Sequence, residues 1–273
     1  MLSWFEAAVL GLVQGLTEFL PISSSAHVRV VSELFGWEDP GAAFTAVIQL
    51  GTEAAVLVYF RQDIWRIVST WSRSLVKPEL RGHIDARMGW YVIVGTLPIG
   101  ILGFTFRDAI EGPARNLWLI ASMLVVFGVL IGIADARAQN LRPLQRLTMR
   151  DAVLYGLAQS LALIPGVSRS GGTVGAGLLM GYRRDAAARY AFLLAIPAVL
   201  TSGIFELRKI GEGEPVDWGP TLLSTVISFA VGLAVIHYFM RYISTHSFRP
   251  FVLYRVALGV VLLVLLAVGV IDA

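Results

Sequence analysis

The sequence predicts an all-α polytopic membrane protein with six transmembrane helices and two re-entrant helical hairpins, arranged as an inverted-topology repeat. The 273 residues are 56% hydrophobic and only 15% charged, whereas an average soluble domain is about a quarter charged. The mean hydropathy is +0.71. Several apolar segments approach or reach the roughly 20 residues that a helix needs to cross a bilayer. Two further apolar stretches are broken by proline, and they resemble each other.

The first broken stretch lies near the N-terminus. Residues 7–17 are apolar but too short to span a bilayer, and they are followed by Glu18, Pro21 and the serine run 23–25. A second short helix is expected over residues 26–35. A helix, a break and a second helix are typical of a re-entrant hairpin. Such a break is tolerated inside a membrane only where protein or water surrounds the backbone.

Six full-length crossings are expected outside the two hairpins. They contain few ionisable side chains, namely Glu53, His237 and Arg255. The predicted crossings are residues 41–60, 89–106, 116–134, 190–205, 218–240 and 250–270.

The second broken stretch, residues 152–168, breaks at Pro165-Gly166, and a short helix over 171–182 follows it. Its residues 156–170 align with residues 11–25 without a gap. The matching pairs are Gly11 with Gly156, Leu12 with Leu157, Gln14 with Gln159, Leu16 with Leu161, Ser23 with Ser168 and Ser25 with Ser170. We therefore expect a single integral membrane domain over residues 1–273, with repeats at about 1–135 and 150–273.

Charge placement predicts the orientation. The connections over residues 61–87 and 137–150 are rich in arginine and are expected in the cytoplasm. The acidic connections near residues 108–111 and 206–217 are expected outside. The first hairpin would then enter from the outer face and the second from the cytoplasm. Inverted repeats with broken helices place their sites near the midplane, where the breaks meet.

The two breaks carry groups that favour an anion. Helices that begin near residues 23–25 and 168–170 expose free backbone N–H groups and positive dipole ends. Arg169 adds a fixed charge whose fork suits phosphate. The candidate substrate-binding residues are Gln14, Ser23, Ser25, Ser168, Ser170, Gly171 and Thr173.

The first break also carries groups suited to nucleophilic catalysis. Gln14 and Glu18 are four residues apart, and Ser24 and His27 are three apart, so each pair shares a helical face. A hydroxyl, an imidazole and a carboxylate beside an anion site are the components of phosphoryl transfer. Ser24 is the expected nucleophile, with His27 or Glu18 as its base, and His27 is the alternative nucleophile.

The segments QGLTEFLPISSSAH (14–27) and PGVSRSGGT (165–173) resemble the two motifs of the bacterial undecaprenyl-pyrophosphate phosphatase family linked to bacitracin resistance. The resemblance extends over essentially the whole chain, including FTAVIQLG (44–51) and the pair Tyr254-Arg255. It implies removal of the terminal phosphate from a polyprenyl pyrophosphate lipid, which recycles the carrier lipid for cell-wall synthesis.

By position, the resemblance implies Glu18, Ser24, His27 and Arg169 as catalytic or phosphate-binding residues. It further implies a divalent cation, Mg²⁺ or Ca²⁺, with Glu18 as a candidate ligand. The expected location is the bacterial cytoplasmic membrane, with the site open to the outer face. Gln14 stands at a motif position where Glu also occurs. Because a glutamine side chain is neutral, it cannot be an anionic ligand, and Glu18 is expected to be the main carboxylate ligand of the cation.

Other interpretations remain open for single features and for the whole. The serine run is a common helix cap, His27 alone fits an interfacial residue, and Glu53 could pair with Arg255. A lipid-phosphate flippase or an anion transporter would also show broken helices and a midplane anion site. A carrier, however, has no need for a nucleophile beside a base.

Composition excludes some classes of site. The chain has no cysteine, so disulfides and thiolate metal sites do not arise. The pI near 9.4 reflects arginines that suit anionic lipid headgroups, and no nucleic-acid partner is expected. The sequence leaves open whether the protein forms a homodimer.

Overall fold

The computed structural model describes residues 2–39, 41–106, 116–209 and 217–271. Over these residues the regular structure is helical, with one isolated backbone bridge between Arg142 and Tyr182 and no strand. The predicted all-α class is therefore confirmed for the part described. The helices are α1 Trp4–Thr17, α2 Ser24–Leu34, α3 Gly41–Tyr59, α4 Arg61–Val76, α5 Ile84–Thr105, α7 Leu117–Ala136, α8 Met149–Ser160, α9 Arg169–Leu179, α10 Arg184–Lys209, α11 Trp218–Ile243 and α12 Arg249–Ala267.

Five helices of the described part are long and apolar enough to cross a membrane: α5, α7, α10 over Arg184–Ile204, α11 and α12. They coincide with five of the six predicted crossings. The sixth, residues 41–60, corresponds to α3, in which Phe44–Tyr59 forms a shorter apolar helix. The predicted outer connection near residues 108–111 lies outside the described residues, as do residues 210–216 of the one near 206–217. The described ends of the second connection are helical: α10 continues to Lys209, and Asp217 is the N-cap of α11.

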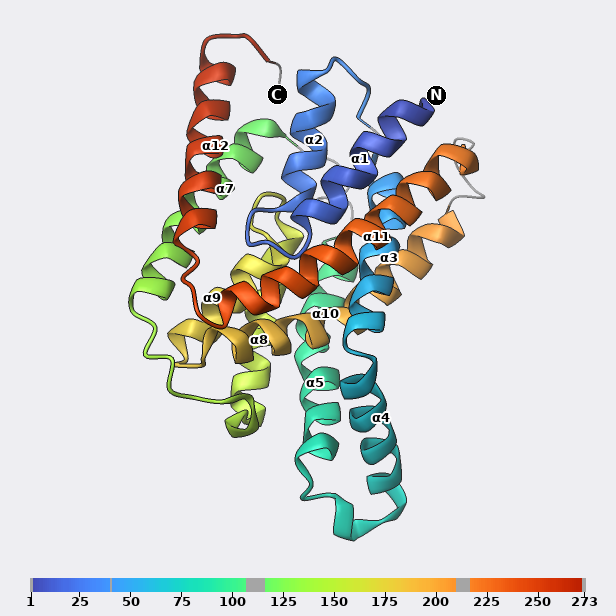
Figure 1. Cartoon of the computed structure of the whole chain (residues 1–273), viewed down its shortest axis with the longest axis vertical. Helices are drawn as coiled ribbons and strands as arrows, with labels where there is room; N and C mark the ends of the chain where they lie inside the picture. Colours follow the sequence, from blue (N-terminus) through green and yellow to red (C-terminus); the bar gives the residue numbers. More distant parts are fainter. Residues whose placement is uncertain (1, 40, 107–115, 210–216, 272–273) are drawn as a thin grey trace.

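The helices pack in pairs that recur between the two halves of the chain (Figure 1). α1 packs against α11, and α8 packs against α5. α3 contacts α10 and α11, whereas α10 contacts α3 and α5. α7 and α12, the last helices of the two halves, pack against each other. Each hairpin helix that precedes a break thus packs against a long helix of the other half.

Two aligned glycines permit close approaches within two of these pairs. A Cβ on Gly11 of α1 would collide with the backbone of Ser224 in α11. A Cβ on Gly156 of α8 would likewise collide with the backbone of Gly95 in α5. The glycines that match in the sequence alignment therefore perform the same packing role in the two halves.

Some predicted boundaries were wrong. The first helix of the second hairpin ends at Ser160, with a 3₁₀ turn over Leu161–Leu163, instead of continuing to Pro165. Its end comes early because the residue before a proline avoids helical dihedrals, and Ile164 is extended. α10 begins six residues before the predicted crossing, at Arg184, where that arginine pairs with Asp135.

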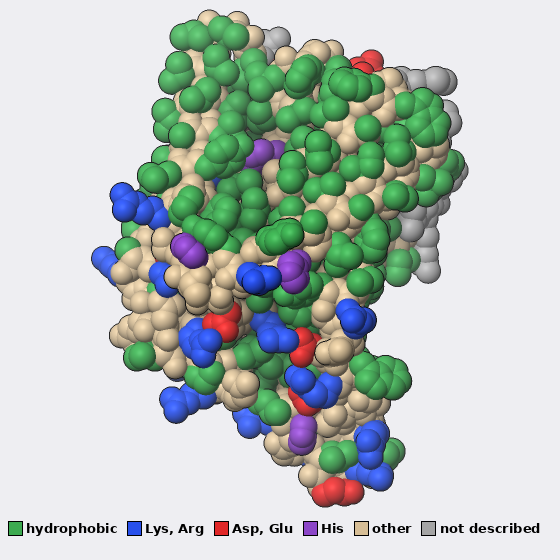
Figure 2. All heavy atoms as spheres, in the orientation of Figure 1, with side chains coloured by type: hydrophobic (Ala, Val, Ile, Leu, Met, Phe, Trp, Pro, Cys, Tyr) green, Lys and Arg blue, Asp and Glu red, His purple; other side chains and the backbone are tan. Residues whose placement is uncertain are grey.

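The helix α4 was not predicted, because the connection over residues 61–87 was interpreted from its charge alone. Ile64 and Ile67 pack against the core, while most side chains of α4 are exposed. Its first turn is joined to α5 and α10 through Asp63, Arg66 and Arg189. On the face in Figure 2, charged side chains gather over the lower part of the molecule, and hydrophobic side chains cover the upper part.

Candidate active site

The second helix of each hairpin begins at a serine with left-handed backbone. Ser23 precedes α2 with a φ of 72°, and Ser168 precedes α9 with a φ of 73°. Asn140 is the only other non-glycine residue with positive φ in the described segments. Such backbone is uncommon outside glycine and gathers at functional sites. The two helix starts lie where the sequence predicted them.

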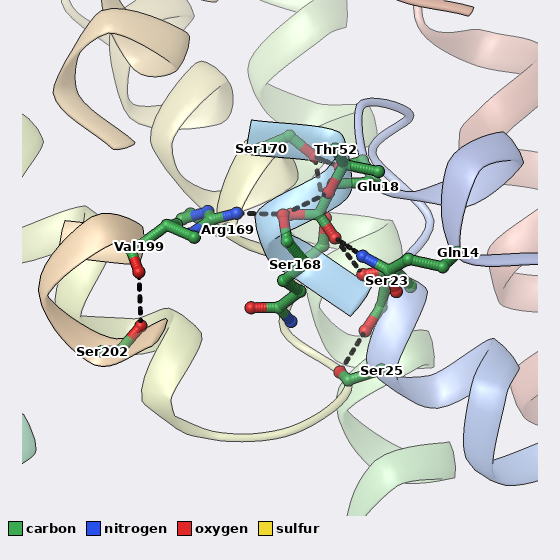
Figure 3. Close-up of polar contacts among 12 residues, drawn as sticks. Gln14, Glu18, Ser23, Ser25, Thr52, Ser168, Arg169, Ser170, Val199 and Ser202 are labelled. Carbon is green, nitrogen blue, oxygen red and sulfur yellow. Dashed lines mark hydrogen bonds and ion pairs between the residues drawn. The ribbon is translucent and has the colours of Figure 1, made fainter. Parts of the chain in front are cut away.

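The carboxylate of Glu18 collects hydrogen bonds from both hairpins (Figure 3). Its Oε2 accepts from Gln14 Nε2 at 2.8 Å and from Ser24 Oγ at 2.5 Å. Its Oε1 forms an ion pair with Arg169. The Glu18 side chain is only 7% exposed, so these donors replace water around a buried charge.

Local chain geometry explains how these groups meet. Glu18 ends α1 and donates its backbone N–H to the carbonyl of Gln14 at 3.0 Å. Gln14 and Glu18 therefore keep the helical spacing that places both side chains on one face. The chain then turns through Pro21, and Ser24 returns as the first residue of α2.

The start of α9 is tied to the break of the first hairpin. Ser170 Oγ donates to the carbonyl of Leu20 at 3.0 Å, and Ser168 Oγ caps the helix by accepting from the Gly171 N–H at 3.1 Å. Thr173 Oγ1 donates to the Arg169 carbonyl of its own helix at 2.6 Å. Ser170 and Thr173 thus already use their hydroxyl protons on backbone oxygens.

The start of α2 is different. Ser23 makes no side-chain cap to the helix, and its hydroxyl lies 3.3 Å from that of Ser25. The first N–H groups of α2 consequently lack a side-chain cap from Ser23. Of the two helix starts, α2 presents the uncapped positive end, beside Ser24.

His27 lies one turn from Ser24 but is bonded elsewhere. Its Nδ1 is 2.7 Å from the Ser23 carbonyl oxygen, and its Nε2 is 2.9 Å from the hydroxyl of Tyr254. The two rings stack, with centroids 5.6 Å apart. Within the described residues no hydrogen bond joins His27 to Ser24 or Glu18, so the group that holds the Ser24 hydroxyl is the carboxylate of Glu18.

Arg255 was not predicted as part of the site, although it connects the two breaks. It is fully buried. Its guanidinium donates to the carbonyl of Pro21 at 2.8 Å in the first break and to that of Gly166 at 2.7 Å in the second. It also reaches Leu124 O of α7 at 3.1 Å. The sequence hint was an arginine inside an apolar crossing, since such residues are functional or structural candidates.

Glu53 of α3 lies beside Glu18 and Arg169 and not beside Arg255. Glu53, Glu18 and Arg169 line one small cavity. Glu53 is 3% exposed, and its Oε1 has no hydrogen-bond partner in the described part of the chain. The interpretation of Glu53 and Arg255 as an ion pair was therefore wrong.

The donor set of this cavity suits a hard cation. Two carboxylates, Glu18 and Glu53, face the same space, and one oxygen of Glu53 is unpartnered. Oxygen ligands are those that Mg²⁺ and Ca²⁺ prefer. Gln14 instead serves Glu18 as a hydrogen-bond donor.

Comparison with known proteins decides the family. The family model described as "Bacitracin resistance protein BacA" matches residues 7–261. The chain belongs to this family. The family predicted from the two motifs is therefore confirmed.

Curated relatives match the BacA-family chain along its whole length. A protein of Streptomyces coelicolor named "Undecaprenyl-diphosphatase 2" is 60% identical and covers 99% of this chain and 97% of its own. An "Undecaprenyl-diphosphatase" of Nocardioides sp. is 60% identical, with both chains covered completely. An "Undecaprenyl-diphosphatase 2" of Frankia casuarinae is 61% identical over 99% of this chain and 97% of its own.

Proposed function

We propose that the protein is an integral membrane phosphatase that hydrolyses undecaprenyl pyrophosphate to undecaprenyl phosphate and inorganic phosphate. Family membership and relatives named undecaprenyl-diphosphatase over the full length support this function. The observation that carries it is the 2.5 Å hydrogen bond from Ser24 Oγ to the buried carboxylate of Glu18. A hydroxyl held by a carboxylate is an activated nucleophile.

In the proposed reaction, Ser24 Oγ attacks the terminal phosphorus while Glu18 Oε2 takes the hydroxyl proton. A bond forms between Oγ and phosphorus, and the bond from phosphorus to the bridging oxygen breaks, so undecaprenyl phosphate leaves. Water then hydrolyses the phosphoserine and restores Ser24. Arg169 and the N–H groups at the start of α2 stabilise the equatorial oxygens.

Arg169 has to leave Glu18 in order to bind phosphate. In the structure its guanidinium is paired with that carboxylate, which neutralises a charge that would otherwise repel the substrate. Transfer of the guanidinium to the terminal phosphate frees Glu18 to act as a base. A divalent cation at the carboxylates would offset the pyrophosphate charge when bound.

We further infer the inverted repeat, with six crossings and two re-entrant hairpins. The matched roles of Gly11 and Gly156, the matched backbone of Ser23 and Ser168, and the recurring helix pairs support it. The arginine-rich connections favour a cytoplasmic side. The first hairpin would then open to the outer face of a bacterial cytoplasmic membrane.

Phosphate release from the purified protein in detergent tests this function. Wild type should release inorganic phosphate from undecaprenyl pyrophosphate, and Ser24→Ala or Glu18→Gln should reduce turnover at least about a hundredfold. Ser32→Ala is the matched control, since this buried serine of α2 only donates to the carbonyl of Val28. A carrier would release no phosphate in an assay without compartments, and that result would refute the proposal.

A further inference from the structure

Glu53 has a position that the two sequence motifs do not explain. It lies in α3, outside both hairpins, and is 3% exposed. Its Oε1 has no hydrogen-bond partner among the described residues. Neither Arg255 nor Arg169 forms an ion pair with it in the described structure, because Arg255 binds carbonyl groups and Arg169 binds Glu18.

The carboxylate of Glu53 faces the catalytic cluster. It lines a cavity with Glu18, Arg169 and Ser170, whose other walls include Phe19 and Phe192. The cavity is small, about 10 Å³, which is enough for a single atom or ion of water size. In Figure 3 the ribbon of α3 passes through the region of Glu18 and Arg169, in agreement with this lining.

The charges of this cavity do not balance. When both are ionised, the carboxylates of Glu18 and Glu53 face a single guanidinium, that of Arg169, and a pyrophosphate group would bring further negative charge. An unpaired carboxylate between aromatic walls is strongly unfavourable. A divalent cation would bind the unpartnered carboxylate oxygen of Glu53. It would also offset the negative charge of the carboxylates and of the phosphates.

We propose that Glu53 and Glu18 are the two protein carboxylates that hold the divalent cation, with pyrophosphate oxygens completing its coordination. Glu53 supplies the second carboxylate that Gln14 cannot supply. Gln14 directs its amide nitrogen to Glu18 as a hydrogen-bond donor. This assignment rests on the proposed function, since the phosphates of the substrate share the cation.

Manganese binding tests the assignment without reference to turnover. Free Mn²⁺ is measured by electron paramagnetic resonance while protein in detergent is titrated in the presence of methylenediphosphonate, a pyrophosphate analogue that cannot be hydrolysed. The Mn²⁺ held by methylenediphosphonate alone is measured without protein and subtracted. Loss of even an indirect metal partner weakens affinity by about 10 to 100-fold. Glu53→Gln should therefore weaken Mn²⁺ binding at least about tenfold. Glu79 is an exposed residue of the arginine-rich connection over residues 61–87, so Glu79→Gln should leave Mn²⁺ binding unchanged.

A rescue variant separates a cation ligand from a structural residue. The double variant Glu53→Gln with Gln14→Glu places a second carboxylate beside Glu18 again, now at position 14. Its affinity for Mn²⁺ should therefore recover at least partly. Glu53→Asp, which keeps the charge, should bind Mn²⁺ more tightly than Glu53→Gln. Both results support the assignment if the variants unfold at the same temperature as wild type.

Three outcomes would overturn it. The first is unchanged Mn²⁺ affinity in Glu53→Gln, which would make Glu53 a neutral hydrogen-bond donor to substrate. The second is absence of Mn²⁺ binding by wild type with methylenediphosphonate. The third is equal losses in Glu53→Asp and Glu53→Gln. Phosphate release by wild type is measured separately, so a failure of the proposed function is distinguished from a failure of the cation assignment.

Discussion

Arg169, the first residue of α9, forms an ion pair with Glu18, the residue that ends α1. The pair joins the two hairpins across 151 positions of the chain. Neither hairpin therefore completes the candidate site alone. In the proposed reaction the nucleophile and its base come from the first hairpin, and the guanidinium that binds phosphate comes from the second.

Replacing Arg169 by lysine tests the phosphate role of its guanidinium. Lysine keeps the charge but loses the planar fork that binds two oxygens at once. We expect kcat for phosphate release to fall about a hundredfold, as when one donor to a developing oxyanion is removed. Arg29→Lys is the control, because Arg29 forms an ion pair with Glu33 on α2 outside the site. Near-normal turnover of Arg169→Lys would contradict a bidentate role.

The position of His27 predicts that it orients the first break instead of attacking phosphorus. Tyr254→Phe removes one hydrogen bond to the imidazole, worth about 1 kcal/mol, so turnover should fall by less than about tenfold. Protein quenched during turnover should carry acid-stable phosphate on Ser24, seen by mass spectrometry of peptides. Acid-labile phosphate on His27 would identify the histidine as the nucleophile.

Replacing Arg255 by alanine is expected to lower the stability of the fold strongly. Its guanidinium satisfies carbonyl oxygens of both breaks and of α7, and each buried carbonyl left without a donor costs about 1 to 3 kcal/mol. Arg255→Ala should therefore lower the unfolding free energy by more than about 3 kcal/mol. Thermal unfolding in detergent measures this, with exposed Arg249→Ala as control. Equal unfolding temperatures for the two variants would show that Arg255 does not hold the breaks together.

The stability of the fold is expected to depend on pH through Asp151. This residue lies in the first turn of α8, outside the candidate spans. Burial alone would raise the pKa of Asp151, but hydrogen bonds from Tyr182, Thr148 and Arg142, with the charge of Arg142, lower it overall. A carboxyl with a lowered pKa stabilises the fold above its unfolded value of about 3.9. That contribution is lost as the pH falls through the folded pKa.

Asp151→Asn should therefore lower the unfolding temperature at pH 7. The difference in unfolding temperature between this variant and wild type should become smaller below about pH 4. Unfolding temperatures from pH 7 to pH 3 measure this. Asp185→Asn is the control, because Asp185 forms an exposed ion pair with Arg183. A difference between wild type and Asp151→Asn that stays constant with pH would contradict the linkage.

The parts of the site that local sequence determines were predictable. Helix starts at Ser24 and Arg169 follow from serines after a proline break, and the contact of Gln14 with Glu18 follows from helical spacing. Family resemblance added the roles expected of Ser24 and His27. These features depend on a few neighbouring residues.

The remaining parts depend on packing between distant helices. Arg255 reaches Pro21 across 234 positions, and Glu53 meets Glu18 only because α3 packs beside the first hairpin. Neither residue was predicted as part of the site, because an ionisable side chain in an apolar crossing does not specify its partners. The helix α4 was missed for a different reason, since the connection over residues 61–87 was interpreted from its charge alone.

The orientation of the chain predicts which surfaces an external reagent can reach. The native chain has no cysteine, so a single introduced cysteine is labelled without background. Glu38 follows α2 at the end predicted to lie outside, and Lys77 follows α4 on the arginine-rich connection; both side chains are exposed. In intact spheroplasts a membrane-impermeant thiol reagent should label Glu38→Cys and not Lys77→Cys. Both should be labelled after lysis, which controls for accessibility. Labelling of Lys77→Cys alone in intact cells would reverse the orientation and place the opening of the first hairpin on the cytoplasmic side.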